Sequence, residues 1–280
     1  MKNFNQKVAA ITGAGSGIGQ QLAILLAQQG AHLALSDINE KGLVETQALL
    51  QQYPVKVTVT KLDVSNQQAV RDWAEDSFKA HGKINLIFNN AGVALASTVE
   101  GMSYEELDWI FKINFWGVVY GTKEFLPYLK QSGEGHIINI SSLFGLTAQP
   151  TQSAYNATKF AVRGFTEALR QELKLQNDGV SSTCVHPGGI RTNIANSARM
   201  SDSIRSLGMN PVKASQAFNK VLKTPPEQAA KVILDAVKAD KARILIGNDA
   251  KVLDLIQRIT PTHYSNALSF FTKKSKKKKA

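Results

Sequence analysis

The stretch VAAITGAGSGIG, residues 8–19, carries the signal on which the fold prediction rests. Its first five residues are apolar or β-branched and predict a buried strand, and a helical pattern follows over residues 18–29. The intervening glycines allow a sharp turn and let a ligand approach the backbone without a Cβ in the way. Because the next helix offers unpaired N–H groups and the positive end of its dipole, the turn predicts a phosphate-binding site. Its candidate residues are Gly13, Gly15, Ser16, Gly17, Ile18 and Gly19.

The alternation of a short apolar run and a helical pattern repeats along the chain. Further strands are predicted over residues 31–36, 55–62, 84–89, 136–141, 180–186 and 244–246. Helical patterns lie over residues 40–52, 66–81, 103–131, 153–177 and 226–239. Most of the strands are apolar on both faces, which is typical of a parallel sheet covered by helices on both sides. The sequence therefore predicts a single doubly wound α/β domain of the Rossmann type with a seven-stranded parallel sheet.

Two segments depart from this alternation. Residues 188–224 are polar with scattered apolar side chains, and a long insertion in a compact domain is usually a lid or a binding loop. We therefore expect a nucleotide-binding catalytic domain over residues 1–248, with a substrate lid at 188–224. Residues 249–280 are expected to form a helical extension with a lysine-rich tail. The apolar residues at helical spacing are Val252, Leu255, Ile256 and Ile259, with a weaker repeat at Tyr264, Leu268 and Phe271.

Composition excludes several classes of protein. The chain has 280 residues, of which 43% are apolar and 20% charged, as in ordinary globular domains. The longest apolar run, residues 22–27, is far shorter than the ~18 residues that a membrane-spanning helix needs. A secretory signal is not expected, because only residues 8–11 are apolar between Lys7 and the glycines. The single cysteine, Cys184, excludes an internal disulfide and a thiolate zinc site, so a cytoplasmic location is expected.

The formal net charge of +11 is concentrated at the end of the chain. Six lysines lie in the last eight residues, so about half of the excess belongs to the tail. A fold that binds nucleic acid would spread its charge over a face or a helix, and nucleic acid is therefore not the expected partner. A solvated end is the simplest interpretation, and weak peripheral contact with an anionic membrane is the second.

Asp37 follows the second predicted strand, 18 residues beyond Gly19. This is close to the usual spacing for the acid that accepts hydrogen bonds from the adenosine ribose of a dinucleotide. Its carboxylate would repel a 2′-phosphate. The positions where a cationic partner for that phosphate would be expected hold Ala14, Ser16 and Ile38, and none of these is Arg or Lys. The pattern favours NAD over NADP. The alternative is a strand-end aspartate that caps the next helix near Asn39.

Tyr155 and Lys159 are four residues apart on a predicted helix and share one face. A free tyrosine has a pKa of about 10, and a fixed ammonium group nearby would favour the tyrosinate. A tyrosine with a lowered pKa could exchange a proton with a carbinol oxygen. Taken alone, however, such a pair is usually an ordinary helix surface pair. His186, at the end of a predicted strand, is interpreted as a structural histidine.

The motifs gain meaning from their order. The glycine turn, Asn89-Asn90-Ala91-Gly92, Asn114, Ser142, Tyr155-x-x-x-Lys159 and Pro187-Gly188 follow one another at the separations of a known family. Over residues 4–248 the chain resembles the short-chain dehydrogenase/reductase family in its one-domain, NAD-preferring form. The glycine spacing Gly-x-x-x-Gly-x-Gly is weak evidence for the family by itself, but the combination of all these motifs in this order is highly specific for it. The C-terminal extension and its lysines are the departures from the pattern.

This resemblance implies a catalytic set. Tyr155 would be the acid/base, and Lys159 would lower its pKa and bind the nicotinamide ribose. Ser142, thirteen residues before Tyr155, would hold the substrate oxygen. Asn114 would anchor a water that links Lys159 to solvent. The remaining implied cofactor contacts are Asp63, Val64, Asn90, Ala91, Gly92, Pro187, Gly188, Ile190 and Thr192.

The implied function is an NAD(H)-dependent oxidoreductase that interconverts a secondary alcohol and its ketone or aldehyde without a metal. Ala94, Leu95, Leu143 and Phe144 flank the expected substrate side and suggest a lipophilic substrate. Aromatic residues on the 103–131 helix suggest an interface, and a homodimer or homotetramer is the family expectation. The alternative is an NAD-binding sensor or membrane-surface scaffold without turnover. The complete set of Asn114, Ser142, Tyr155 and Lys159 favours the enzyme.

Overall fold

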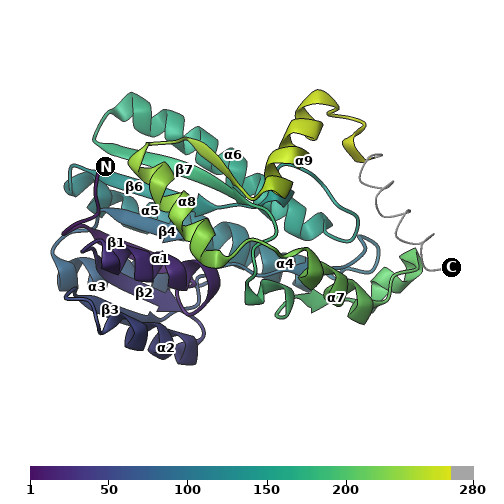
Figure 1. Ribbon diagram of the computed structural model, residues 1–280, viewed down its shortest axis with the longest axis horizontal. Helices are drawn as coiled ribbons and strands as arrows, with labels where there is room; N and C mark the ends of the chain where they lie inside the picture. Colours follow the sequence, from purple (N-terminus) through teal and green to yellow (C-terminus); the bar gives the residue numbers. More distant parts are fainter. Residues whose placement is uncertain (266–280) are drawn as a thin grey trace.

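Seven parallel strands form the central sheet, in the order β3-β2-β1-β4-β6-β7-β9 (Figure 1). The computed structural model describes residues 1–194 and 196–265. The strands are β1 (Val8–Thr12), β2 (His32–Asp37), β3 (Val57–Lys61), β4 (Leu86–Asn89), β6 (Gly135–Ile140), β7 (Val180–Pro187) and β9 (Arg243–Ile246). Each predicted strand is present, with ends that shift by at most two residues. The predicted seven-stranded parallel sheet is therefore confirmed.

Helices cover both faces of this sheet and bury two separate apolar cores. Alternate residues of β1 point to opposite faces, so that Ile11 packs into one core and Val8 into the other. The first core lies under α1 (Gly17–Gln28), α2 (Glu40–Leu50) and α8 (Pro226–Lys238). The second lies under α3 (Gln67–His81), α5 (Gly117–Gln131) and α6 (Ser153–Gln176). This two-layer coverage is why the strands are apolar on both faces.

The direction of strand addition reverses beside β1. The strand β2 pairs with one edge of β1 and β4 pairs with the other, and all of these pairs are parallel. The loops that follow β1 and β4 therefore leave the sheet on opposite sides and form a crevice at its carboxyl edge. In such sheets this crevice is the usual place for a ligand, and the glycine turn forms one of its walls.

The predicted single helix over residues 103–131 was wrong in one respect. The segment is divided into α4 (Tyr104–Phe111), a π-helical turn (Lys112–Trp116) and α5. The helix α4 begins with a capping box between Ser103 and Glu106, as its sequence favours. The π turn contains the buried Asn114. Such a turn adds one residue without ending the helix, so the helical pattern continues after it with its phase shifted by one residue and no break marks the place.

The insertion at residues 188–224 is more regular than its composition suggests. It contains α7 (Pro211–Val221), two 3₁₀ turns (Asn193–Ala195 and Asp202–Leu207) and the short strand β8 (Arg199–Met200). The strand β8 pairs in parallel with β5 (Leu95–Ala96) and ties the insertion to the loop after β4. Strands of two residues are too short to leave a pattern in the sequence.

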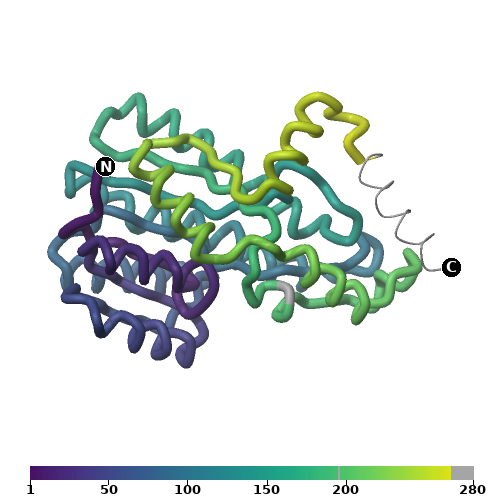
Figure 2. The backbone as a smooth tube through the Cα atoms, viewed as in Figure 1, coloured from purple at the N-terminus to yellow at the C-terminus, as the bar shows by residue number. Residues whose placement is uncertain are grey.

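The chain leaves the sheet through α9 (Asn248–Ile259), as the helical spacing predicts. Figure 2 shows the 188–224 segment in green and α9 in yellow at the same end of the sheet. Leu268, Phe271 and the lysines at 273–279 lie outside the described residues. None of the helices within residues 1–265 combines the length and the apolar character that a membrane crossing requires.

Candidate active site

In the glycine turn between β1 and α1, the backbone at Gly19 packs directly against the backbone at Gly13. Gly13 and Gly17 have φ of +67° and +55°, a region that glycine adopts without strain. A Cβ on Gly19 would lie 2.1 Å from the Gly13 carbonyl oxygen, so the helix can start here only without that atom. Ser16 is the N-cap of α1, and its side chain makes no capping hydrogen bond. The free N–H groups of the first helical turn therefore face the crevice, which suits an anion.

The carboxylate of Asp37 stabilises the same turn. Its Oδ2 accepts a hydrogen bond from the Gly15 N–H at 2.8 Å, and its Oδ1 accepts one from the Asn39 N–H at 2.8 Å. The helix cap itself is Asn39, whose side chain accepts from Gly42. The alternative interpretation, a local strand-end role, is thus part of what Asp37 does. A carboxylate has about four acceptor positions, so capacity for two ribose hydroxyls is left.

A threonine that the sequence analysis did not assign a role joins the two walls of the crevice. The Thr12 hydroxyl accepts hydrogen bonds from the N–H groups of Asn90 and Ala91, each at 3.0 Å. The Asn90 amide donates in return to the carbonyls of Thr12 and Gly13, at 2.9 Å and 3.2 Å. These contacts fix the loop after β4 against the glycine turn. The position of Thr12 at a strand end before the glycines was the available signal.

Asp63 and Val64 lie at the edge of the crevice after β3. The Asp63 carboxylate is exposed and accepts hydrogen bonds from the backbone and hydroxyl of Ser65. Val64 is buried, and its side chain packs against Gly117 at the start of α5. Of the two predicted residues, Asp63 is thus accessible to a ligand through its side chain, whereas Val64 mainly positions the loop.

Asn114 uses its whole side chain to hold the loop that carries Gly92. Its Oδ1 accepts from the Val93 N–H at 2.8 Å, and its Nδ2 donates to the Val93 carbonyl at 2.9 Å. The same Nδ2 lies 3.3 Å from the Thr158 hydroxyl on α6. The π turn makes this possible because it turns Asn114 inward. A Cβ on Gly92 would lie 3.2 Å from Asn114 Oδ1 and 3.5 Å from Lys159 Nζ, so this glycine borders both.

Tyr155, Lys159 and Ser142 lie together at the carboxyl edge of the sheet. The Lys159 ammonium donates to the Ile140 carbonyl at 3.0 Å and lies 5.7 Å from the centre of the Tyr155 ring. The Ser141 hydroxyl donates to the Lys159 carbonyl at 2.8 Å, which commits it to the backbone. The Ser142 hydroxyl accepts from the Phe144 N–H at 3.0 Å and keeps its own proton for donation. Of the two neighbouring serines, Ser142 is therefore the one with a hydroxyl available to a substrate.

The charge states differ from the expectation. Burial raises the pKa of Tyr155 above its usual value, and a hydrogen bond with Ser142 opposes this effect only in part. Burial also lowers the pKa of Lys159 to about 8, while the Cys184 side chain acts in the opposite direction. The lowered pKa of Tyr155 that the family resemblance implies is thus not a property of the protein residues alone. Desolvation of the phenolate outweighs the hydrogen bond from Ser142.

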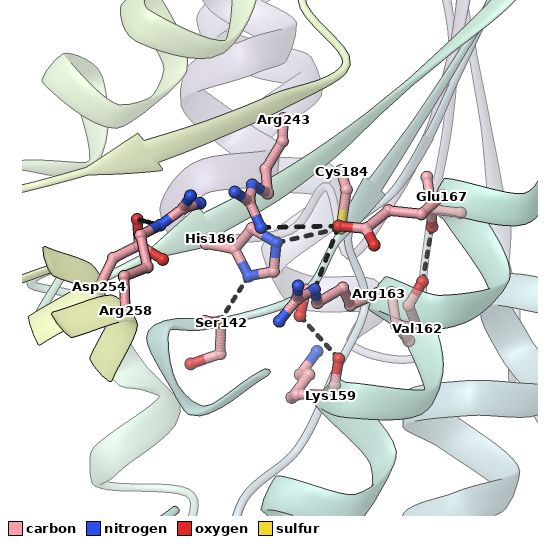
Figure 3. Close-up of polar contacts among 12 residues, drawn as sticks. Ser142, Lys159, Val162, Arg163, Glu167, Cys184, His186, Arg243, Asp254 and Arg258 are labelled. Atoms are coloured by element: carbon pink, nitrogen blue, oxygen red, sulfur yellow. Dashed lines mark hydrogen bonds and ion pairs between the residues drawn. The ribbon is translucent and has the colours of Figure 1, made fainter. Parts of the chain in front are cut away.

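The His186 side chain hydrogen-bonds the main chain of Ser142 (Figure 3). Its Nδ1 lies 2.8 Å from the Ser142 carbonyl oxygen, and its Nε2 lies 3.3 Å from Cys184 Sγ. A carbonyl oxygen only accepts, so Nδ1 carries the proton and Nε2 accepts from the thiol. Burial lowers the pKa of His186 to about 4, and it raises the pKa of Cys184 to about 12. Both groups are neutral at physiological pH, in agreement with a structural role for His186.

The segment after β7 passes over the glycine turn. Gly188 continues the sheet through a hydrogen bond from its N–H to the Ile246 carbonyl, and Ile190 is buried. The Thr192 methyl group lies 2.9 Å from the place where a Cβ on Gly17 would stand. Pro187, Gly188, Ile190 and Thr192 thus lie along one path that ends over the N-terminus of α1.

An apolar cavity of 180 Å³ lies between the loop after β4 and the 188–224 segment. Its wall includes Phe144, whose ring packs edge-to-face against Tyr155 with the centres 6.1 Å apart. Gln149, Thr151 and Gln152 add polar groups at one side. The apolar lining is formed by Ala94, Leu95, Ala96, Phe144, Pro150, Ala198, Met200, Ile204, Met209, Ala214 and Phe218.

The arrangement fits a dinucleotide. A helix N-terminus without side-chain capping, glycines that a Cβ would block and a strand-end carboxylate line one crevice. The proton-carrying groups of Tyr155, Lys159 and Ser142 lie at its far end, beside the apolar cavity. Such a site can bind a substrate oxygen and move a proton to or from it.

Comparison with known proteins gives consistent results. The model of the short chain dehydrogenase family matches residues 7–203. The chain is 45% identical over 270 residues to the protein SadH of Mycobacterium tuberculosis, whose name describes it as an oxidoreductase, with 96% of each chain covered. A short chain dehydrogenase/reductase of Burkholderia phymatum in complex with NAD has a TM-score of 0.85 and 29% identity, with coverage of 93% and 95%. An alcohol dehydrogenase of Thermococcus sibiricus complexed with 5-hydroxy-NADP has a TM-score of 0.70 and 26% identity, with coverage of 86% and 95%.

Proposed function

Because the chain belongs to the short-chain dehydrogenase family, we propose that it is an NAD(H)-dependent oxidoreductase that interconverts a lipophilic secondary alcohol and the corresponding carbonyl compound. One observation carries this proposal: Tyr155, Ser142 and Lys159 lie at the end of a crevice built for a dinucleotide and beside an apolar cavity. The segment 188–224 is then the lid over the substrate, and residues 1–248 are the catalytic domain.

The chemistry follows from the positions of these side chains. Bound NAD would supply the hydride acceptor at its nicotinamide ring, and the positive charge of the ring would favour the Tyr155 phenolate. Ser142 donates a hydrogen bond to the substrate oxygen, and Tyr155 accepts the hydroxyl proton as the C–H bond breaks. Lys159, whose Nζ lies 5.7 Å from the centre of the Tyr155 ring, stabilises the phenolate while it is protonated. Its remaining N–H groups would bind a ribose hydroxyl.

The raised pKa of Tyr155 gives the two directions opposite pH dependences. Carbonyl reduction needs the protonated phenol, and burial keeps the phenol protonated at neutral pH. Alcohol oxidation needs the phenolate, so its rate should increase as the pH rises toward the pKa of Tyr155. Asn114 takes part indirectly, because it holds the loop of Gly92 against Lys159.

The apolar cavity leads to a test of the substrate class. With NAD present, secondary alcohols with aliphatic or aromatic substituents should be oxidised with kcat/KM at least about tenfold above that for polyols, since each buried CH₂ contributes ~0.8 kcal/mol. The measurement is NADH absorbance with a matched panel of alcohols. Rapid turnover of sugars or polyols without turnover of apolar alcohols would contradict the assignment.

Asp37 gives a test of the cofactor preference. Replacing Asp37 with Ser removes the carboxylate that would repel a 2′-phosphate, and the ratio of kcat/KM for NADP over NAD should rise at least about tenfold. The ratio is the informative quantity, because loss of the hydrogen bond to Gly15 would weaken binding of both cofactors. Asp63→Ser, which removes an exposed acid at the edge of the crevice, is the control and should leave the ratio nearly unchanged. An equal loss for both cofactors in Asp37→Ser would contradict the proposed preference.

We also propose that the enzyme is a homodimer or a homotetramer. An aromatic surface supports this, because Trp116 is 45% exposed and Phe160 40% exposed on neighbouring helical segments. The Trp116 ring stacks on Tyr120 at 5.7 Å, and Phe115 packs against Phe165 on α6. Exposed aromatic clusters of this kind are typical of protein interfaces.

A further inference from the structure

The helix α9 carries apolar side chains on its outward face as well as on the face turned toward the domain, where Ala250 is buried. Val252, Leu255 and Ile259 are 55%, 57% and 70% exposed, whereas Asp254 is buried. The spacing of three and four residues places the three apolar side chains on one outward stripe of the helix. A helix that only covered the domain would have no second apolar stripe turned outward. The outward apolar stripe is therefore a candidate binding surface for a partner.

The inward face of α9 is fixed by polar contacts. Asp254 accepts a hydrogen bond from Arg258 at 2.8 Å and lies near the cluster of Arg163, Glu167 and Arg243 (Figure 3). The Asp249 carboxylate accepts from the Gly189 N–H at 2.7 Å. The Asp254–Arg258 bond lies within α9, so it is the Asp249 contact with Gly189, together with the burial of Ala250, that sets the rotation of the helix.

We propose that this stripe, Val252, Leu255 and Ile259, docks on an anionic membrane surface. The positive charges near the stripe and later in the chain favour an anionic surface as its partner. Lys251 is exposed beside the stripe, and six lysines follow within the last eight residues of the chain, at 273–279. An apolar stripe that has a cation beside it and is followed in the sequence by a run of lysines suits the boundary between the headgroups and acyl chains of anionic lipids. A second copy of the chain is the weaker partner, because a stable dimer buries about 800 Å² per partner and three side chains on one helix offer much less.

The position of α9 gives this docking a consequence for the site. The helix starts directly after the carboxyl end of β9, at the same edge of the sheet as Tyr155. Figure 1 shows α9 at the margin of the molecule, apart from the helices that cover the sheet. The Tyr264 hydroxyl, just beyond α9, accepts a hydrogen bond from the Ala148 N–H at 3.0 Å, next to the cavity residues Gln149–Gln152. Docking would therefore bring the cavity wall close to a source of lipophilic molecules.

The test is flotation of the full chain with vesicles of zwitterionic lipid alone and of a mixture with anionic phospholipid. The wild-type protein should float with the anionic vesicles, and salt should weaken this binding. Combined replacement of Val252, Leu255 and Ile259 with Ser should reduce the partition coefficient at least about tenfold. The matched control is serine at Val44, Leu49 and Leu175, three exposed apolar helical residues elsewhere, and it should float as the wild type does.

A second variant tests the stripe without removing apolar surface. In Leu255→Trp, the new indole should be quenched by lipids with brominated acyl chains. Absence of quenching while the protein still floats would overturn the proposal, and so would unchanged flotation of the triple serine variant. Loss of oligomerisation in that variant, with vesicle binding intact, would identify a second copy as the partner instead and would also overturn it.

Discussion

Replacing Tyr155 with Phe is expected to lower kcat for alcohol oxidation by about 10³-fold, because a positioned acid/base contributes roughly 10²- to 10⁴-fold. The substitution removes one oxygen and keeps the ring that packs against Phe144. The affinity for NADH should therefore change little. The pH dependence assigned to Tyr155 should disappear from the residual rate. Stopped-flow or steady-state NADH absorbance measures the rate, and fluorescence titration measures the affinity.

Tyr104→Phe is the matched control for this variant. Tyr104 is 85% exposed at the start of α4, and its loss should leave kcat and the pH profile unchanged. Turnover in Tyr155→Phe equal to that of the wild type would contradict the assigned role. Loss of NADH binding together with turnover would indicate instead that Tyr155 acts only in cofactor binding.

Replacing Gly19 with Ala is expected to weaken NADH binding at least about tenfold and to destabilise the fold by about 1–3 kcal/mol. The new Cβ would lie 2.1 Å from the Gly13 carbonyl oxygen and 2.7 Å from Asn90 Nδ2. A backbone carbonyl cannot move without shifting the whole glycine turn, and this turn holds the N–H groups meant for the pyrophosphate. Fluorescence titration and urea denaturation measure the two effects.

Gly164 offers the same substitution without the clash. It lies within α6, and a Cβ there would meet nothing within 4 Å. Alanine favours a helix over glycine by about 1 kcal/mol, so Gly164→Ala should be at least as stable as the wild type and bind NADH normally. If Gly19→Ala behaved in the same way as Gly164→Ala, the close approach at the glycine turn would not be what cofactor binding requires.

The fold could be predicted from the sequence because most of its helices are long and most of its strands are buried on both faces. The apolar runs of β1 and β4 and the helical periods of α1 and α6 need no knowledge of tertiary contacts. The π turn at Asn114 and the β5–β8 pair are different. The π turn shifts the phase of the helical pattern by one residue without breaking it, and a two-residue strand is too short to show a period. Each depends on partners far away in the chain, such as Val93 and Arg199.

The site residues could be proposed from their order, but their electrostatics could not. Tyr155 and Lys159 are close in space, as their spacing predicts. The pKa of each depends on how deeply the sheet and the lid bury it, and burial shifts both toward the neutral form. The role of Thr12 likewise follows from the proximity of the loops after β1 and β4, which strand order creates and sequence order hides.

A crystal structure of the protein with NAD and an unreactive alcohol analogue would test the central claim most directly. We expect the pyrophosphate at the N-terminus of α1 beside Gly17, the ribose on Asp37, and the analogue's oxygen within hydrogen-bond distance of both the Tyr155 and Ser142 hydroxyls. A dinucleotide bound elsewhere, or a nicotinamide ring too far from Tyr155 for the alcohol carbon to lie between them, would contradict it.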